Sequence, residues 1–339
     1  MSKSILLSGF SDEAANEKLA VQQYSAFAAL GLKYHSLRFV DAGEGIKNVM
    51  LLTDPEIERL KKMQCDYGLK VSSIGSPIGK VKLRDEDDGT TNRYVPFDKY
   101  LREDVKRACE MATAFNSKLI RGFAFYHPKG SSPASHLEQA SEQLGQIAEL
   151  CDKHGLTFGL EVEANLIGQT GDLLAELHTR VNHPAMVTIF DAANIVTQGF
   201  TADETYAQYL AMKPSLGWIH IKDYHDPNPR GRIEHVDEAS LSHFVPADQG
   251  DSGHEAILRD FASYLPEVHE RMTARGVDGV FFDLEPHVKG GGQFGGFSGP
   301  DGFGVAARGL CRLLDYVGIG YQLRDYTDVK NSVGHIGHS

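Results

Sequence analysis

The feature that most constrains the fold is a regular alternation of short apolar runs and longer amphipathic stretches along almost the whole chain. The short runs are typical of buried strands, and the amphipathic stretches are typical of helices with one apolar face. The predicted strands span residues 5–8, 34–39, 71–74, 119–123, 157–161, 186–191, 216–221 and 280–285. A chain that repeats this unit eight times is predicted to close its parallel strands into a barrel.

The predicted helices carry recognisable start and stop signals. In Thr53-Asp54-Pro55-Glu56, either Thr53 caps the helix with Glu56 closing a capping box, or Asp54 caps it with Pro55 in the first turn. Gly155 is placed to cap the end of another helix. Helices are expected at about residues 12–30, from residue 53 onward, and at 97–115, 137–151, 171–181, 203–212, 255–275 and 305–316.

The sequence therefore predicts an α/β protein with a single-domain (β/α)8 TIM barrel. Its 339 residues are enough for such a barrel, and no Pro/Ser-rich linker divides them. We assign residues 1–330 to the barrel and 331–339 to a C-terminal tail. The charged segment 80–96 and the glycine-rich segment 290–304 follow the third and eighth strands, on the face where barrels place active sites. The glycine-rich segment is predicted to be a mobile lid over that face or else an idle loop.

Charge and cysteine content exclude several classes of partner. Lys and Arg number 34 against 46 Asp and Glu, giving a net charge of -12, the wrong sign for a nucleic-acid-binding protein. The four cysteines are far apart and form no CxxC pair, so we expect no disulfide framework and a reducing, cytoplasmic location. No run approaches the ~18 apolar residues of a membrane span, and the apolar start is too short for a secretory signal. Neither nucleic acid nor a membrane is expected as a partner.

Metal-binding side chains stand at the ends of the fifth to eighth predicted strands. They are Glu161, Asp191, His220 and Glu285, within GLEVEAN, TIFDAAN, WIHIKD and FFDLEPH. Taken singly, each is more often a helix cap, half of an ion pair or a structural histidine. Since neighbouring strands lie about 4.8 Å apart, however, the four can converge at one barrel mouth. Three carboxylates and an imidazole would repel one another there without a cation, so the sequence predicts one divalent ion.

The nature of these ligands restricts the choice of metal. Oxygen-rich ligation with one imidazole suits Mn²⁺, Mg²⁺ or Co²⁺ better than a structural zinc. Mn²⁺ is our first expectation.

With these motifs in this order, the chain resembles the xylose-isomerase-like barrel superfamily of sugar isomerases, epimerases and apurinic endonucleases. The resemblance to its tagatose-epimerase-like and inosose-dehydratase-like members implies that Glu161, Asp191, His220 and Glu285 hold one divalent metal. It also implies a reaction on a keto-sugar or polyol, in which the metal stabilises an enediolate. Glu161 and Glu285 would then also be catalytic, as base and acid.

Residues next to the predicted ligands are candidates for substrate binding. Glu163 and Asn165 share the side of Glu161 on an extended segment, where they bind substrate hydroxyls or cap the next turn. Asn194 stands where several relatives carry a His that contacts substrate or a second metal, which argues against a multi-metal site here. Lys222 orients His220 or holds an oxyanion, or else forms a surface ion pair.

Four further residues have both a functional and a structural interpretation. His127 could be an additional catalytic acid or base, or lie on a loop surface. Arg38, Arg121 and the substrate-binding candidate Arg232 could hold a carboxylate or phosphate, or form ion pairs.

Three alternatives to an isomerase or epimerase stay open. A keto-glycoside-cleaving lyase, similar to C-glycoside deglycosidases that work with a small partner subunit, would use the same metal and proton abstraction. The long segments 80–96, 223–253 and 286–304 leave room for a larger glycoside or a partner chain. An apurinic endonuclease would need many more histidines than these motifs contain. The last alternative is a non-catalytic sugar-binding barrel.

Relatives are often dimers or tetramers, so a homo-oligomer is also possible.

Overall fold

The structure is a computed structural model that describes residues 4–229, 231–238, 241–289, 297–325 and 327–328. The predicted tail at 331–339 and residues 290–296 of the predicted lid lie outside the described residues. The predictions for these two segments therefore stay predictions.

Eight parallel strands form one barrel, as the sequence predicted. Neighbouring strands follow the order β1-β12-β9-β8-β7-β6-β5-β2, and a parallel bridge between Phe10 and Ser36 joins the two ends of the sheet. The strands are β1 (Leu6–Gly9), β2 (Tyr34–Leu37), β5 (Lys70–Ile78), β6 (Leu119–Gly122), β7 (Thr157–Glu161), β8 (Met186–Asp191), β9 (Leu216–Ile221) and β12 (Phe281–Leu284). The carboxyl ends of all eight strands therefore meet at one mouth.

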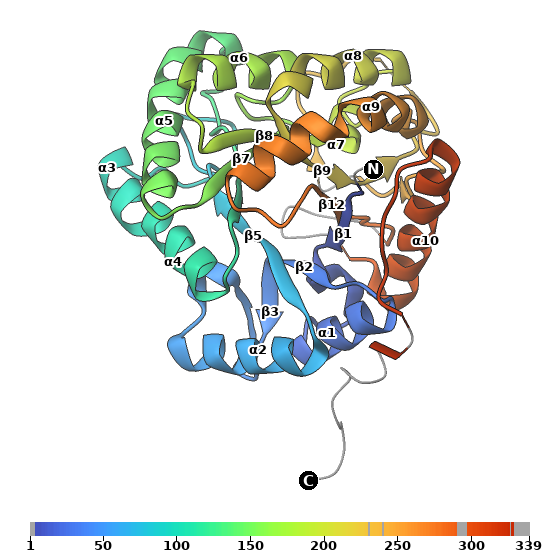
Figure 1. Cartoon of the computed structure of the whole chain (residues 1–339). Coiled ribbons are helices and arrows are strands. Elements are labelled where there is room, and N and C mark those ends of the chain that lie inside the picture. The colour runs from blue at the N-terminus through green and yellow to red at the C-terminus, as the bar shows by residue number, and fades with distance from the viewer. Residues whose placement is uncertain (1–3, 230, 239–240, 290–296, 326, 329–339) are drawn as a thin grey trace.

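Helices surround the strands (Figure 1). They are α1 (Ala20–Ala29), α2 (Asp54–Tyr67), α3 (Phe97–Tyr100), α4 (Lys106–Ala114), α5 (Leu137–Lys153), α6 (Gly171–Val181), α7 (Ala192–Val196), α8 (Ala202–Met212), α9 (His254–Ala274) and α10 (Gly299–Val317). Short antiparallel pairs lie after the second and seventh barrel strands: β3 (Phe39–Asp41) with β4 (Ile46–Asn48), and β10 (Asp223–Tyr224) with β11 (Phe244–Val245). Apart from these pairs, each barrel strand is followed by one or more helices.

The single helix predicted at residues 12–30 is wrong. A 3-10 turn at Ser11–Ala14 is separated from α1 by irregular residues. Lys18 in this gap has a φ of 56°, a left-handed conformation that an α-helix interior does not allow. The final helix also begins earlier than predicted, at Gly299 rather than residue 305, because Pro300 and Asp301 suit a first helical turn.

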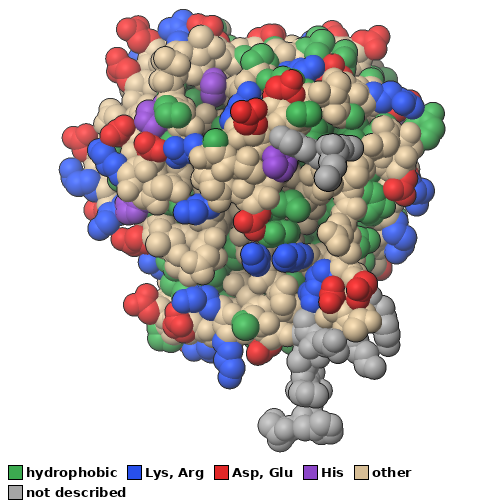
Figure 2. Space-filling model, viewed as in Figure 1, with side chains coloured by type: hydrophobic (Ala, Val, Ile, Leu, Met, Phe, Trp, Pro, Cys, Tyr) green, Lys and Arg blue, Asp and Glu red, His purple; other side chains and the backbone are tan. Residues whose placement is uncertain are grey.

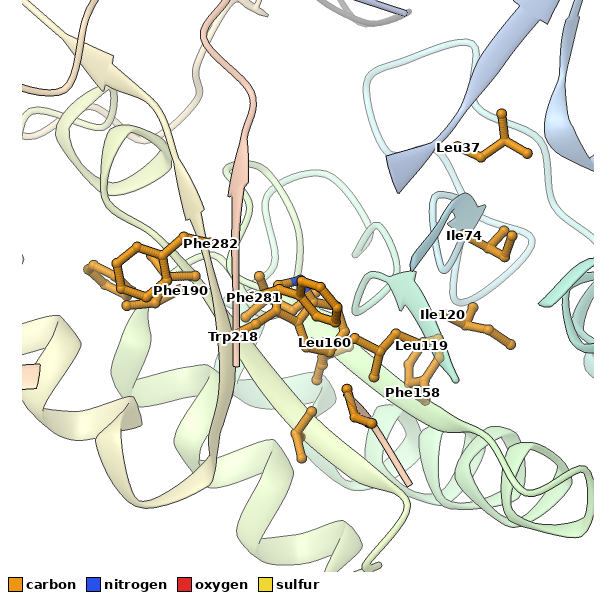
Figure 3. Packing of buried hydrophobic residues seen from close by; sticks show 14 of the residues in the cluster. Leu37, Ile74, Leu119, Ile120, Phe158, Leu160, Phe190, Trp218, Phe281 and Phe282 are labelled. Carbon is orange, nitrogen blue, oxygen red and sulfur yellow. The ribbon is translucent and has the colours of Figure 1, made fainter. Parts of the chain in front are cut away.

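The hydrophobic core lies between the strands and the helices, and aromatic and branched side chains dominate it (Figure 3). Successive strand residues point to opposite faces, so that Phe190 contacts the ring of Tyr209 on α8 and Phe282 contacts that of Phe261 on α9. Inside the barrel, the ring of Trp218 occupies the space above Gly159, where an added Cβ would lie 2.0 Å from it. The strands are thus fixed from both sides, and their ends are held rigidly.

On the face shown in Figure 2, acidic and basic side chains are interspersed. Hydrophobic side chains are exposed there in separate small areas rather than in one patch. Within the described residues, no helix combines the length and apolar character that crossing a membrane requires.

The capping-box alternative at the start of α2 is confirmed. The Thr53 N–H donates to Glu56 Oε2 at 2.8 Å, with Pro55 in the first turn. Lys47 Nζ donates to the other Glu56 oxygen at 2.7 Å. Although burial opposes it, the hydrogen bonds from Lys47 and Thr53 lower the pKa of Glu56 from 4.5 to about 2.

We therefore expect Glu56→Gln to destabilise the fold in a pH-dependent way. A carboxyl whose pKa is lower in the folded state stabilises the fold above its unfolded pKa, and this stabilisation is lost as the pH falls through the folded value. The difference in free energy of unfolding between wild type and variant should be full above about pH 5 and disappear toward pH 2. Urea denaturation across this range measures it, and a pH-independent difference would contradict the assignment.

Candidate metal centre and active site

Glu161, Asp191, His220 and Glu285 come together at the barrel mouth. Their ligand atoms all lie within 4.8 Å of one another, and all four residues are buried. The strand register explains this, because Asp191 on β8 pairs directly with His220 on β9. The Glu285 N–H donates to Ile221 O at 3.1 Å, which continues the pairing of β12 with β9. The cluster could therefore hold a metal ion, as the strand ends predicted.

The imidazole of His220 turns its Nδ1 toward the carboxylates. This nitrogen is 2.9 Å from Glu161 Oε1 and 3.9 Å from Glu285 Oε2. The ring also packs edge-on against Phe10, with centroids 5.3 Å apart. His220 is thus fixed with one nitrogen directed at the centre of the cluster.

Lys222 lies among the carboxylates. Its Nζ is 3.0 Å from Asp191 Oδ2 and 3.2 Å from Glu285 Oε2, and the side chain is 5% exposed. Asp191 Oδ2 is buried, and within the described residues its charge is met by the Lys222 ion pair rather than by a hydrogen bond. Three carboxylates and one imidazole with this spacing could hold a metal ion.

Each ligand glutamate also bonds to an arginine. Arg38 Nη1 donates to Glu285 Oε1 at 2.6 Å, and Arg121 Nη1 donates to Glu161 Oε2 at 3.2 Å. The two guanidinium groups lie 4.3 and 5.0 Å from the centroid of the same ring, Phe10. These contacts orient the two carboxylates and offset part of the negative charge.

Arg38 connects this centre to a second buried cluster. Its Nη2 is 3.2 Å from Asp12 Oδ2 and 3.3 Å from Glu13 Oε1, and Glu13 Oε1 is 2.8 Å from His287 Nδ1. The internal ion pair that the sequence allowed for Arg38 is therefore present. It joins the first segment of the barrel to the last.

The surrounding charges set the protonation of the glutamates. Although burial opposes it, His220 and Arg121 lower the pKa of Glu161 to about 2. Against the same burial, Lys222, His287 and Arg38 hold the pKa of Glu285 well below its usual range. Both side chains are consequently carboxylates at neutral pH.

A cavity of about 240 Å³ opens above the cluster. Of the predicted site residues, Glu163, Asn194, Lys222 and Glu285 line it. Glu163 Oε2 is 3.2 Å from Lys80 Nζ. Burial, together with the charges of Glu238 and Glu161, raises the pKa of Glu163 to about 7, against the opposing charge of Lys80. The cavity therefore holds a further carboxyl beside the ligand set.

Asn194 lies at the edge of the cluster. Its Nδ2 donates to Val162 O at 3.0 Å and to Glu161 Oε1 at 3.5 Å. Its backbone N–H donates to Asp191 Oδ1 at 3.2 Å. Asn194 thus connects the ends of β7 and β8 while it also lines the cavity.

The structure does not place His127, Asn165 or Arg232 in the cavity lining. His127 stacks on His136, with centroids 6.2 Å apart. Asn165 exchanges two hydrogen bonds of 2.9 Å with the backbone of Val236, so its amide holds the long loop after β10. Arg232 is half exposed, packs over Phe200 and pairs with Glu204 at 3.2 Å. Each of these three side chains has a structural partner outside the site.

Sequence reasoning missed Asp283, which lies below the metal cluster inside the barrel. Its Oδ2 accepts from Ser36 Oγ at 2.9 Å and is 4.0 Å from His220 Nε2. Trp218 Nε1 donates to the same His220 nitrogen at 3.4 Å. A signal was present, because Asp283 is two residues before Glu285 and so shares its face of the strand.

Replacing Asp283 by Asn should weaken metal binding about 10-fold or more, since it removes the negative charge behind the ligand imidazole. Titration calorimetry with Mn²⁺ measures the change. Asp152→Asn, which changes a partly exposed aspartate on α5 that pairs with Arg275, is the matched control and should bind Mn²⁺ like wild type. Equal affinity in the Asp283 variant would show that this charge plays no part in orienting His220.

Comparison with known proteins identifies the family. Residues 25–301 match the model of the xylose isomerase-like TIM barrels, and the chain belongs to this family. No curated protein matches the sequence.

Solved structures similar to this chain cover nearly its whole length. The probable 3-DHS dehydratase AsbF from Bacillus anthracis is 16% identical with a TM-score of 0.60, covering 91% of this chain and 99% of its own. A xylose isomerase-like TIM barrel protein from Mycobacterium smegmatis in complex with magnesium is 18% identical with a TM-score of 0.61, covering 93% and 96%. D-psicose 3-epimerase from Clostridium cellulolyticum H10, solved with D-tagatose, is 15% identical with a TM-score of 0.54, covering 93% and 98%. At these identities the similarity concerns the fold.

Proposed function

We propose that this protein is a divalent-metal-dependent isomerase or epimerase of a keto-sugar or polyol. The observation that carries the proposal is the convergence of Glu161, Asp191, His220 and Glu285 in one buried cluster, of which Glu285 lines the cavity. Similar barrels solved with magnesium and as a sugar epimerase support it. Mn²⁺ is the first candidate for the ion, with Mg²⁺ or Co²⁺ as the others.

A bound divalent ion would supply the positive charge that stabilises the two oxygens of an enediolate. Glu161 and Glu285 are ionised at neutral pH, so either can accept the proton from the carbon next to a carbonyl. That step breaks a C–H bond and forms an O–H bond on the carboxyl group. Return of the proton to the neighbouring carbon gives an isomer, and delivery to the opposite face of the same carbon gives an epimer.

We expect Glu285→Gln to abolish turnover while some metal is still bound, because the amide cannot accept the proton. The measurement is NMR of solvent deuterium entering a panel of keto-sugars in D₂O, with protein stripped of metal and then reloaded with Mg²⁺. Wild type should show exchange only with metal, accompanied by a new stereoisomer. Glu149→Gln, which changes an exposed glutamate on α5, should behave like wild type. Turnover retained by the Glu285 variant would remove its proton-transfer role.

A keto-glycoside-cleaving lyase is the second candidate. Glu163 favours it, because this carboxyl group faces the cavity without belonging to the ligand set and could protonate a departing group. A dehydratase, AsbF, is among the similar structures. The same NMR experiment on 3-keto-glycosides separates the two reactions, since a lyase releases an aglycone. A small partner subunit or a homo-oligomer stays a prediction.

A further inference from the structure

Arg121 has more hydrogen-bond donors than the described structure uses. This residue is 6% exposed and lines the cavity. Its Nη1 bonds to Glu161, whereas its Nε is buried and has no hydrogen-bond partner within the described residues. A guanidinium group carries five N–H donors, and a buried donor without an acceptor is unfavourable. The partners of Arg121 in the described structure therefore do not use all of its donors.

Lys80 adds a second cation to the same part of the cavity. Its Nζ is 4.4 Å from the centroid of the Phe123 ring, and Arg121 Cζ is 4.7 Å from the same centroid. Gly79 sets this arrangement, because at its φ of 90° a Cβ would lie 1.9 Å from Phe123 O. The backbone can thus approach Phe123 closely and place Lys80 beside its ring. Glu163 takes one of the three N–H donors of Lys80.

Arg121 and Lys80 have fewer ion-pair partners than the other two cations of the cavity. Arg38 and Lys222 are already engaged, Arg38 by Asp12, Glu13 and Glu285 and Lys222 by Asp191 and Glu285. Arg121 and Lys80 each make one side-chain ion pair in the described structure. If Glu161 coordinates a divalent ion, its carboxylate offsets less of the positive charge of Arg121. Both cations then have donors to offer a ligand in the cavity.

We propose that Arg121 and Lys80 form an anion-binding subsite, and that the substrate is a keto-sugar or polyol that carries a carboxylate or phosphate group. The inference rests on the proposed function and specifies its substrate class. The carbonyl end of the substrate faces the metal ligands, and its anionic group lies on the Phe123 side of the cavity. There the anion accepts charge-assisted hydrogen bonds from the guanidinium and ammonium groups. A neutral sugar offers these two cations no charge beyond the carboxylates of Glu161 and Glu163 that they already contact.

The test is titration calorimetry of the Mg²⁺-saturated full chain with three matched probes. The probes are D-fructose, D-fructose 6-phosphate and D-fructuronate, which differ only in the terminal group. Wild type should bind at least one of the anionic probes about 10-fold to 100-fold more tightly than fructose. Preference for the uronate identifies a carboxylate-bearing substrate, and preference for the phosphate identifies a sugar phosphate.

Lys80→Gln and Arg121→Gln should each reduce this ratio of affinities by about 10-fold, since each removes one charged donor. The ratio compares an anionic probe with fructose in the same variant. It is therefore informative even if Arg121→Gln disturbs Glu161, because the two probes bind beside the same metal centre. Lys80 is partly exposed, and within the described residues its ion pair is with Glu163 rather than with a metal ligand. The Lys80 variant therefore still tests the subsite if the Arg121 variant unfolds. Arg180→Gln, an exposed arginine paired with Glu176 on α6, is the matched control and should keep the full ratio.

Three results would overturn the subsite. They are equal affinity for all three probes in wild type, no binding of either anionic probe up to about 10 mM, and a preference that survives both substitutions. The last result would mean that the metal itself holds the anion. Failure of the proposed function would look different. The protein would then still prefer the anionic probes, but no deuterium would enter any of them.

Discussion

The mutual repulsion of three buried carboxylates at the barrel mouth is the constraint on which the rest of the site depends. Glu161, Asp191 and Glu285 are brought together by strand pairing that local sequence and barrel closure impose. Removing such charges from water is costly unless opposite charges or a cation compensate them. Lys222 and the two paired arginines supply part of this compensating charge. The same arrangement of carboxylates can also bind a divalent ion.

Phe10 shows how the fold satisfies this constraint. It follows β1, bridges to β2, and its ring contacts His220 and two arginines. The ring contributes no charge, but both guanidinium groups pack on it, which holds them beside the glutamates. The network through Arg38 to Glu13 and His287 then connects the beginning of the barrel to the segment that follows its final strand. Barrel closure and ligand geometry are thereby coupled.

Sequence patterns predicted the eight strands and the four converging side chains because both depend on local periodicity and on strand order. They could not predict features that depend on distant contacts. The break at Lys18 arises from a left-handed residue that helix periodicity does not reveal. Asn165 lies close to Glu161 in sequence, yet it holds the backbone of Val236, 71 residues away. Lys80 and Arg121 meet at Phe123 only because two successive barrel strands carry them to the same part of the mouth.

The central claim is that Glu161, Asp191, His220 and Glu285 form one metal site. Titration of metal-stripped protein with Mn²⁺, in wild type and in Asp191→Asn, tests it most directly. We expect saturable binding of about one ion per chain, and a loss of at least 10-fold in affinity when the Asp191 carboxylate is replaced. Absence of saturable binding, or equal affinity in the variant, would contradict the claim.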